Sequence, residues 1–79
     1  MKAKVFVTLK PSILDPQGKT ITGALRSLGY DKVHDVRQGK YFELDVVAKT
    51  VGEAEALVAD VADKLLANPV IESYRVEVE

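Results

Sequence analysis

The first part of the chain alternates apolar and polar residues, which is the period of a β-strand with one buried face. Val5, Val7 and Leu9 lie on the apolar side. Phe6 is the one large apolar residue on the other side, and we expect it to face a partner. The pattern therefore predicts a half-buried strand that stops at Pro11, because proline cannot donate to a ladder of strand hydrogen bonds.

A helix is predicted soon after this strand. Asp15 and Pro16 suit an N-cap and a first helical position: aspartate accepts from the free N–H groups of a first turn, and proline lacks a donor that this turn leaves unpaired. Gly29 is placed as a left-handed C-terminal stop. Between these signals, apolar residues recur at helical spacing and share one face, which consists of Ile21, Ala24, Leu25 and Leu28.

Residues 33–48 return to the strand period, and Gly39 interrupts it. Two interpretations are open. A tight hairpin at Gln38 and Gly39 would give the four-stranded βαββαβ order of a ferredoxin-like fold, whereas a bulge would give one long strand bent at Gly39. We favour the bent strand, because the residues before Gly39 make a poor half-buried strand but a suitable arm into a second subunit. The residues after it that share one face are Phe42, Leu44 and Val46.

A second helix has the clearest signals. Thr50 and Glu53 have the spacing of a capping box. Asn68 and Pro69 mark its end. The apolar stripe between them consists of Ala54, Leu57, Val58, Val61 and Leu65. The last residues alternate again and predict an amphipathic strand whose apolar side is Tyr74, Val76 and Val78.

Together these elements predict an α+β fold in the order β-α-β-α-β, related to the ferredoxin-like fold, with two helices on one face of an antiparallel sheet that dimerisation completes. The 79 residues form a single domain, residues 1–79. A chain of this length buries only about 60% of the surface that its unfolded form exposes. It has no cysteine for a disulfide, so a second subunit is the expected source of further stability.

The net charge of −1 conceals an asymmetry. Residues 1–40 hold eight Lys and Arg against three Asp, whereas residues 41–79 hold three basic residues against nine acidic ones. Two interpretations stay open. Either the halves neutralise each other in the folded chain, or their two fields dock two unlike proteins.

The residue types exclude several kinds of active site. No cysteine is present to act as a nucleophile, and His34 is the only histidine, so we interpret it as an ordinary strand or surface residue. Gln17, Gly18 and Lys19 give a weak phosphate-site signal, but the glycine that a P-loop needs five positions before Gly18 is missing, and capping by Asp15 explains the pattern. Nucleic-acid binding is not expected, because the chain lacks an aromatic-rich, basic surface. We predict no catalytic residue, metal site or cofactor in this chain.

What remains is a set of residue types that protein interfaces favour. Arg37, Gln38, Lys40 and Tyr41 lie beside the bend, and tyrosine and arginine are frequent interface anchors. The loop before the first helix offers apolar groups as well. Its Ile13 and Leu14 either dock a partner or tuck under their own helix as a hydrophobic staple.

Three blocks of the sequence resemble one known family. They are VTLKPSILDPQGK at residues 7–19, DVRQGKYFEL at residues 35–44 and KLLANPVIESY at residues 64–74. In order, spacing and chain length they are similar to the PurS subunits of phosphoribosylformylglycinamidine synthase, the enzyme that makes an amidine from an amide in purine biosynthesis.

The resemblance implies a non-catalytic subunit, dimeric or tetrameric, that bridges a glutaminase subunit and an ATP-dependent synthetase subunit and assists ammonia transfer between them. Such an assembly converts formylglycinamide ribonucleotide, ATP and glutamine to the amidine, ADP, phosphate and glutamate. ATP and Mg would then bind to the synthetase subunit, and no cofactor to this chain. The contact residues that the resemblance suggests are Lys10, Leu14, Asp15, Gln17, Lys19, Arg37, Gly39, Lys40 and Tyr41.

Two other functions remain as alternatives. An ACT-like small-molecule-sensing dimer would hold its ligand at a strand–helix junction, and stabilisation of the isolated protein by a metabolite would favour it. An RNA-binding module would show salt-sensitive binding. No apolar run approaches the roughly 18 residues of a membrane span, and the N-terminus lacks the pattern of a signal peptide. With the absence of cysteine, this predicts a cytoplasmic protein without membrane contact.

Overall fold

The computed structural model describes residues 1–79 and has three strands and two long helices. The elements are β1 Lys2–Leu9, α1 Pro16–Ser27, β2 Gly39–Asp45, α2 Val51–Val61, the π-helical turn η1 Ala62–Leu66 and β3 Glu72–Val78. The strands form one sheet in the order β2-β1-β3, with both pairs antiparallel. The predicted α+β class, the antiparallel sheet and the order of elements are confirmed.

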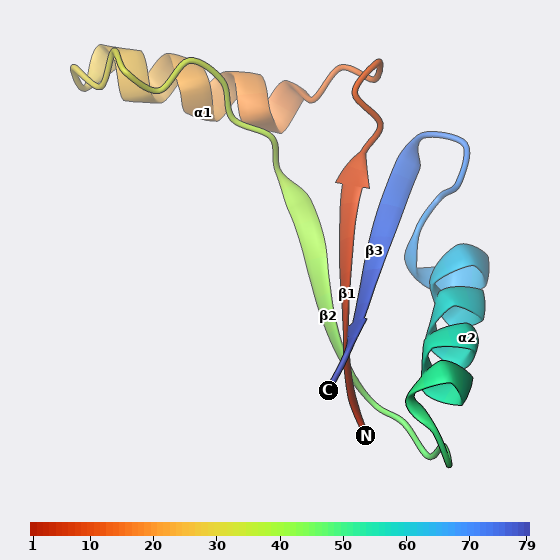
Figure 1. Ribbon diagram of the computed structural model, residues 1–79. Coiled ribbons are helices and arrows are strands. Elements are labelled where there is room, and N and C mark those ends of the chain that lie inside the picture. The colour runs from red at the N-terminus through yellow and green to blue at the C-terminus, as the bar shows by residue number, and fades with distance from the viewer.

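The sheet and α2 share a small hydrophobic core. Figure 1 shows α2 alongside the sheet. β1 is the central strand, and its Val5 and Val7 are fully buried, as the alternation of β1 predicts. Val58 of α2 packs into the same core. Tyr74 of β3 packs against this core from the side. The buried members of the core are Ala3, Val5, Val7, Val46, Ala54, Val58, Ala62 and Ala67.

Both helices begin at the predicted caps. The Asp15 side chain accepts from the Gly18 N–H at the start of α1, and the Thr50 side chain accepts from the Glu53 N–H at the start of α2. Gly29 has φ of 92° and ends α1 in the predicted left-handed conformation. The N–H groups of the two residues after Leu28 bond back to carbonyls of the last turn, which is a Schellman motif.

The prediction that Leu65 belongs to the buried stripe of the second helix is wrong. The helix changes to η1, in which the Ala67 N–H donates to the Ala62 carbonyl five residues earlier. A turn with one extra residue rotates everything after it relative to a regular helix. Leu65 is therefore 80% exposed, and Ala67 takes a buried position instead.

Only α2 lies over the sheet; α1 projects from one end of it (Figure 1). We call residues 10–38 the arm and the remaining residues the body. The arm gives the molecule principal extents of 50 × 25 × 14 Å. The sequence predicts correctly that α1 has an apolar face, but Leu28 on that face is 73% exposed and Ile21 is 39% exposed. The helix therefore differs from its predicted place over the chain's own sheet, because the arm runs outward from the ends of β1 and β2.

The structure decides against a hairpin at Gln38 and Gly39. Residues 30–38 return alongside α1 and do not pair with β2, which bonds to β1 alone (Figure 1). The chain bends at Gly39, as the favoured interpretation predicts. The part before the bend has no strand partner in this chain, so only Gly39–Asp45 counts as a strand.

No helix has the length and apolar character that crossing a membrane requires.

Candidate protein interface

The arm joins the body through a tightly bonded elbow, residues 9–15 together with residues 36–39. Asp15 is its centre. One carboxylate oxygen accepts from the Gly18 N–H at 2.9 Å, and the other accepts from the Gln38 N–H at 2.7 Å. The first bond caps α1, and the second ties the start of α1 to the start of β2. Asp15 is buried, with both oxygens engaged inside the chain.

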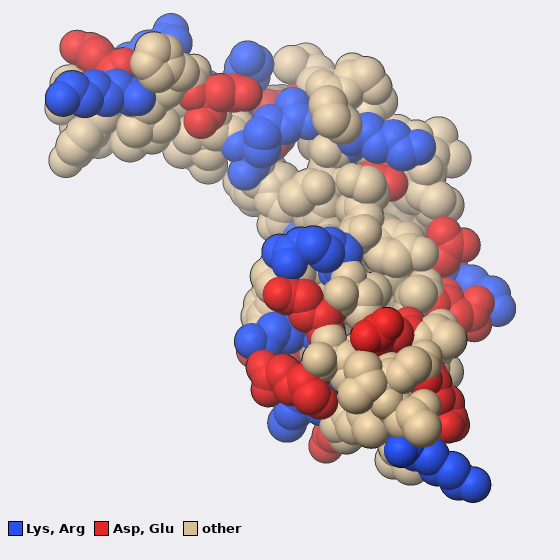
Figure 2. All heavy atoms as spheres, in the orientation of Figure 1, with Lys and Arg blue, Asp and Glu red and all other residues tan.

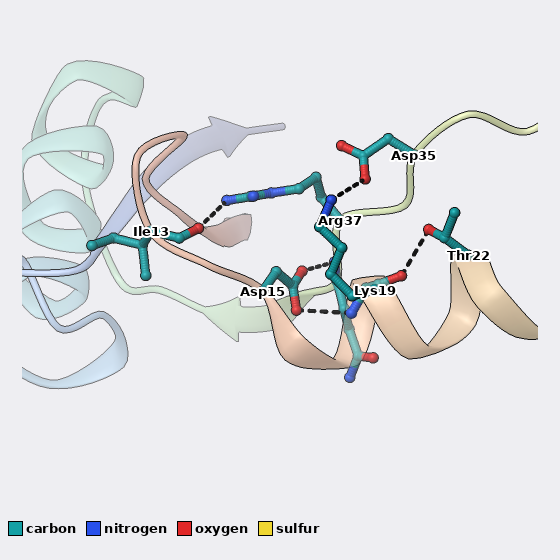
Figure 3. A network of polar contacts seen from close by, with 8 residues as sticks. Ile13, Asp15, Lys19, Thr22, Asp35 and Arg37 are labelled. Atoms are coloured by element: carbon teal, nitrogen blue, oxygen red, sulfur yellow. Dashed lines mark hydrogen bonds and ion pairs between the residues drawn. The ribbon is translucent and has the colours of Figure 1, made fainter.

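Arg37 closes the same elbow from the other side, as Figure 3 shows. Its guanidinium donates to the carbonyls of Lys10 at 3.0 Å and Ile13 at 3.1 Å. A guanidinium offers several donors in one plane, so one side chain can hold successive carbonyls of a loop. Arg37 thus orders the loop between β1 and α1.

Two glycines permit close contact of the backbones in this region. A Cβ on Gly18 would overlap the carbonyl oxygen of Val36, and a Cβ on Gly39 would overlap that of Val7. A side chain at either position would therefore push two chain segments apart. Glycine is a poor helix and strand former, and the close packing of the two backbones accounts for its presence at the start of α1 and of β2.

Charged side chains surround the elbow. Lys40 pairs with Glu72 at 3.3 Å, and this Glu72 also accepts from the Asn68 N–H at 2.7 Å. Lys19 lies 3.9 Å from Asp35 across the arm. The first pair links β2 to β3, and the second links α1 to the segment that returns from it.

The face of the sheet opposite α2, which we call the open face, carries a row of three large side chains. Phe6 stands opposite Tyr41 on one side and Arg75 on the other. The rings of Phe6 and Tyr41 are 5.1 Å apart, and the guanidinium carbon of Arg75 is 4.3 Å from the centre of the Phe6 ring. Aromatic and arginine groups in contact form typical interface anchors.

Charge is divided between the arm and the body as well as between the halves of the sequence. Lys4 pairs with Glu79, and Lys40 pairs with Glu72, so part of the predicted neutralisation between the halves does occur. The arm nevertheless has five Lys and Arg against three Asp, whereas the body has six basic residues against nine acidic ones. Figure 2 shows both signs spread over the two parts.

Comparison with known proteins assigns the family. The family model described as PurS: Phosphoribosylformylglycinamidine (FGAM) synthase matches residues 2–79. The chain belongs to the PurS family. The PurS subunit of phosphoribosylformylglycinamidine synthase from Bacillus subtilis (strain 168) is 53% identical to it over 78 residues, which cover 99% of this chain and 92% of that one.

Solved PurS structures have the same fold. PurS of Methanocaldococcus jannaschii superimposes with a TM-score of 0.89 at 37% identity, covering 99% of this chain and 94% of that chain. A chain in the structure of PurLQS from Thermotoga maritima gives 0.88 at 34% identity, covering 96% and 93%. The resemblance stated from the three sequence blocks is confirmed: the chain is a PurS-type subunit of phosphoribosylformylglycinamidine synthase.

The structure brings most of the PurS contact residues suggested by the sequence to the elbow. Asp15, Gln17, Gly39 and Lys40 line one hollow there, and Arg37 lies beside it. Leu14 is largely exposed, which rules out its role as a staple under α1. Lys10 is part of the elbow through its carbonyl, which accepts from Arg37. Lys19 on the arm and Tyr41 on the open face lie apart from this group.

Sequence reasoning missed Arg75 and Glu72. Both lie on β3, far along the chain from Lys40, which pairs with Glu72, and from Phe6, which Arg75 covers. Arg75 alternates with the apolar residues of its strand, which places it on the same side as Phe6 once β1 and β3 pair antiparallel. The sequence does not show which strands pair, so it does not show that Arg75 lies next to Phe6.

The weak phosphate-site signal has a structural explanation. The Gly18 N–H, which an anion at this helix start would bind, donates to Asp15 instead. No group of three or more His, Cys, Asp or Glu side chains is arranged to hold a metal ion.

Asp15 in the elbow and Glu72 of β3 beside it should make the stability of the protein depend on pH in the acid range. Hydrogen bonds from Gly18 and Gln38 lower the pKa of Asp15, and a bond from the Asn68 N–H, aided by Lys40, lowers the pKa of Glu72. A lowered folded-state pKa gives stability that is present above the unfolded pKa of about 4 and is lost as pH falls through the folded pKa. We expect the free energy of unfolding to decrease from about pH 5 downward.

Urea unfolding between about pH 3 and about pH 7 measures this dependence. Asp15→Asn and Glu72→Gln should each make the acid side of the curve shallower. Asp31→Asn, at an exposed position in the arm, serves as the matched control. An unchanged slope in both Asp15→Asn and Glu72→Gln would contradict the assignment.

Proposed function

We propose that this chain is the non-catalytic connecting subunit of its synthase, which bridges the glutaminase and the ATP-dependent synthetase subunits in the cytoplasm and assists ammonia transfer. The match to the PurS family over residues 2–79 carries the proposal. Its relative in the Thermotoga structure belongs to a PurLQS assembly. In this scheme ATP and Mg bind to the synthetase subunit, and the cysteine that hydrolyses glutamine belongs to the glutaminase, since this chain has no cysteine.

Rigid docking of two enzymes is what ammonia transfer requires. Free ammonia is protonated or escapes in water, so its path must be shielded from solvent while both reactions proceed. A small subunit with several interaction surfaces can serve that purpose without chemistry of its own. The arm, the elbow and the open face are three such surfaces, and they lie on different parts of one chain.

We further propose that the working form is a homodimer in which each arm lies on the body of the other copy. α2 packs mainly over β3 and β1, so Phe42 and Leu44 of β2 are only partly covered. The outer edge of β2 also has free backbone groups. The apolar face of α1, in turn, covers no sheet within its own chain.

A dimer of two copies would cover both the exposed part of β2 and the apolar face of α1. α1 of one copy would cover β2 of the other beside α2, and the segment before Gly39 would pair along the free edge of β2. The sheet would then gain a fourth strand and a second helix layer, which is the ferredoxin-like arrangement assembled from two chains. The net positive arm and net negative body add a favourable, salt-sensitive contribution.

The contact residues suggested by the family blocks remain proposals for the docking of the larger subunits. Leu14 is exposed and Lys10 is half-buried in the loop at the elbow, and Tyr41 lies on the open face. None of these three is needed for the core, so they are free to bind a partner. Asp15 and Gly39 act through the shape of the elbow.

Reconstitution of the synthase with and without this chain tests the connecting role. We expect omission to reduce glutamine-dependent amidine synthesis strongly, while ammonia-dependent synthesis and isolated glutaminase turnover change much less. The reason is that ammonia supplied from solution does not need a shielded path. Product formation from each nitrogen source, measured side by side at equal subunit concentrations, gives the comparison.

Equal loss of both reactions would argue for a general stabilising role. No loss in either would set the proposal aside. The variant Val47→Ala, whose site is exposed and away from the elbow and the open face, is a suitable positive control for a functional subunit.

A further inference from the structure

We propose that the elbow is a selection device: it prevents the arm from closing onto its own sheet and so makes exchange between two copies the only way to complete the fold. The inference rests on the exchanged dimer proposed above. It concerns a different property, the choice between a closed monomer and an exchanged dimer. The two states would contain the same contacts between arm and body, so only the elbow can distinguish them.

The closed alternative is a definite structure. If the chain turned back at Gln38 and Gly39, the preceding residues could pair with the edge of their own β2, and α1 could cover their own Phe42 and Leu44. That monomer would have the βαββαβ order. It would avoid the entropy of association, so at low protein concentration it would be favoured unless the turn itself were costly.

Gly39 opposes the turn first, through its place in the sheet. A two-residue hairpin turn of the favoured types needs positive φ at one or both central residues, a conformation that Gly39 does not have in the structure. Gly39 instead pairs with Thr8 as part of β2, and its backbone is packed against the carbonyl of Val7. Turning at Gly39 would remove this residue from the sheet.

Asp15 and Arg37 block the turn a second time. The Gln38 N–H is held by the buried Asp15 carboxylate, and the Arg37 guanidinium is held by the Lys10 and Ile13 carbonyls. The two residues that precede Gly39 are thus bonded to the loop that begins the arm. A hairpin would have to place Arg37 opposite Lys40 as a strand neighbour, which brings two like charges together.

The Lys10 N–H fixes the other connection. It donates to the Ile71 carbonyl at 2.8 Å, so the arm leaves β1 in a direction set by the body. Both chain connections between arm and body are therefore short and bonded. Short connections of this kind favour exchange between copies over closure within one.

Lengthening one connection is the sharpest test. Insertion of Asn-Gly between Gln38 and Gly39 supplies a two-residue turn with the residues that positive φ favours, and it leaves every elbow side chain in place. The same Asn-Gly inserted after Tyr30, where the chain turns back from α1 and outside residues 31–37, is the matched control. Sedimentation equilibrium gives the mass of each protein, and amide hydrogen exchange reports on residues 31–37.

We expect the wild-type protein and the Tyr30 insertion to be dimers and the Gln38 insertion to be a folded monomer. In that monomer the amides of residues 31–37 should remain protected from exchange, because they pair with their own β2. A dimeric Gln38 insertion variant would overturn the inference. A monomer with unprotected residues 31–37 would also overturn it, since the arm would then be open.

Point variants test the elbow side chains without changing chain length. Asp15→Asn combined with Arg37→Gln should raise the dimer dissociation constant about tenfold, because an arm whose direction is no longer fixed loses preorganisation. Lys49→Gln combined with Glu55→Gln removes one charge of each sign from exposed positions of the body, outside β2 and the arm, and should leave association unchanged. Equal dissociation constants in the two double variants would count against the role of Asp15 and Arg37.

The failure of the proposed dimer can be told apart from the failure of this inference. A monomeric wild-type protein would refute the dimer before any variant is made, and the selection device with it. A dimeric wild-type protein with a dimeric Gln38 insertion variant would refute the selection device alone.

Discussion

Charging the apolar face of α1 should convert the protein from a dimer to a monomer. In Ile21→Glu with Leu25→Glu, two side chains that we place against β2 of a second copy become carboxylates. Each apolar side chain of this size contributes about 1.5 kcal/mol or more when it is buried. Losing two therefore weakens association by about a hundredfold or more, before the cost of burying the new charges.

Sedimentation equilibrium over a range of concentrations measures this effect. Arg26→Glu changes the net charge by the same amount on another side of α1 and is the control. Because α1 makes few contacts with its own body, both variants should keep the circular dichroism of the folded body. If the double variant stays as dimeric as Arg26→Glu, the apolar face of α1 is not part of the dimer interface.

Val58→Ala should have the largest effect of any single conservative substitution that we consider. Val58 is fully buried among β1 and β3 residues, and removing two methyl groups there leaves a cavity that the surroundings fill only in part. The expected loss is about 2 kcal/mol. A domain of this length has only a few kcal/mol from its own core, so about half of its stability would be lost.

Val47→Ala is the same chemical change at a position that is 98% exposed. It should alter the free energy of unfolding by less than about 0.5 kcal/mol. Both variants must be compared at one protein concentration, because association adds to apparent stability by mass action. Similar losses in the two would mean that the core around Val58 does not determine stability.

Local rules account for what the sequence predicted correctly. The Asp15 and Pro16 signal, the Thr50 cap and the left-handed Gly29 each depend on residues within one turn of each other, and all three appear in the structure. The strand alternation of β1 and β3 likewise depends on neighbours in sequence. Such rules do not need the rest of the fold.

The position of α1 could not be derived in this way. An amphipathic pattern shows that a helix buries a face, but it does not show which chain supplies the surface that covers it. The turn η1 is another such case, because nothing in the residues around Leu65 announces the extra residue in the helix. Both errors concern how elements are placed relative to one another, which local spacing does not specify.

The candidate interface was predicted in part for a related reason. Arg37 was selected as an exposed anchor, yet its guanidinium binds carbonyls of its own loop. Main-chain acceptors are the same at every position, so a sequence does not reveal which ones an arginine meets. Tyr41 stays a proposed contact residue; its neighbours Phe6 and Arg75 depend on strand register, which local spacing does not give.

The positions of the three tyrosines allow their intrinsic fluorescence to report on three parts of the molecule. There is no tryptophan, and the three tyrosines lie one in each region: Tyr30 on the exposed arm, Tyr41 on the open face and Tyr74 against the core. Emission from a chain that keeps only one of them, with phenylalanine at the other two, would follow a single event. Arm exchange, docking on the sheet and unfolding of the body could thus be timed separately without attaching a dye.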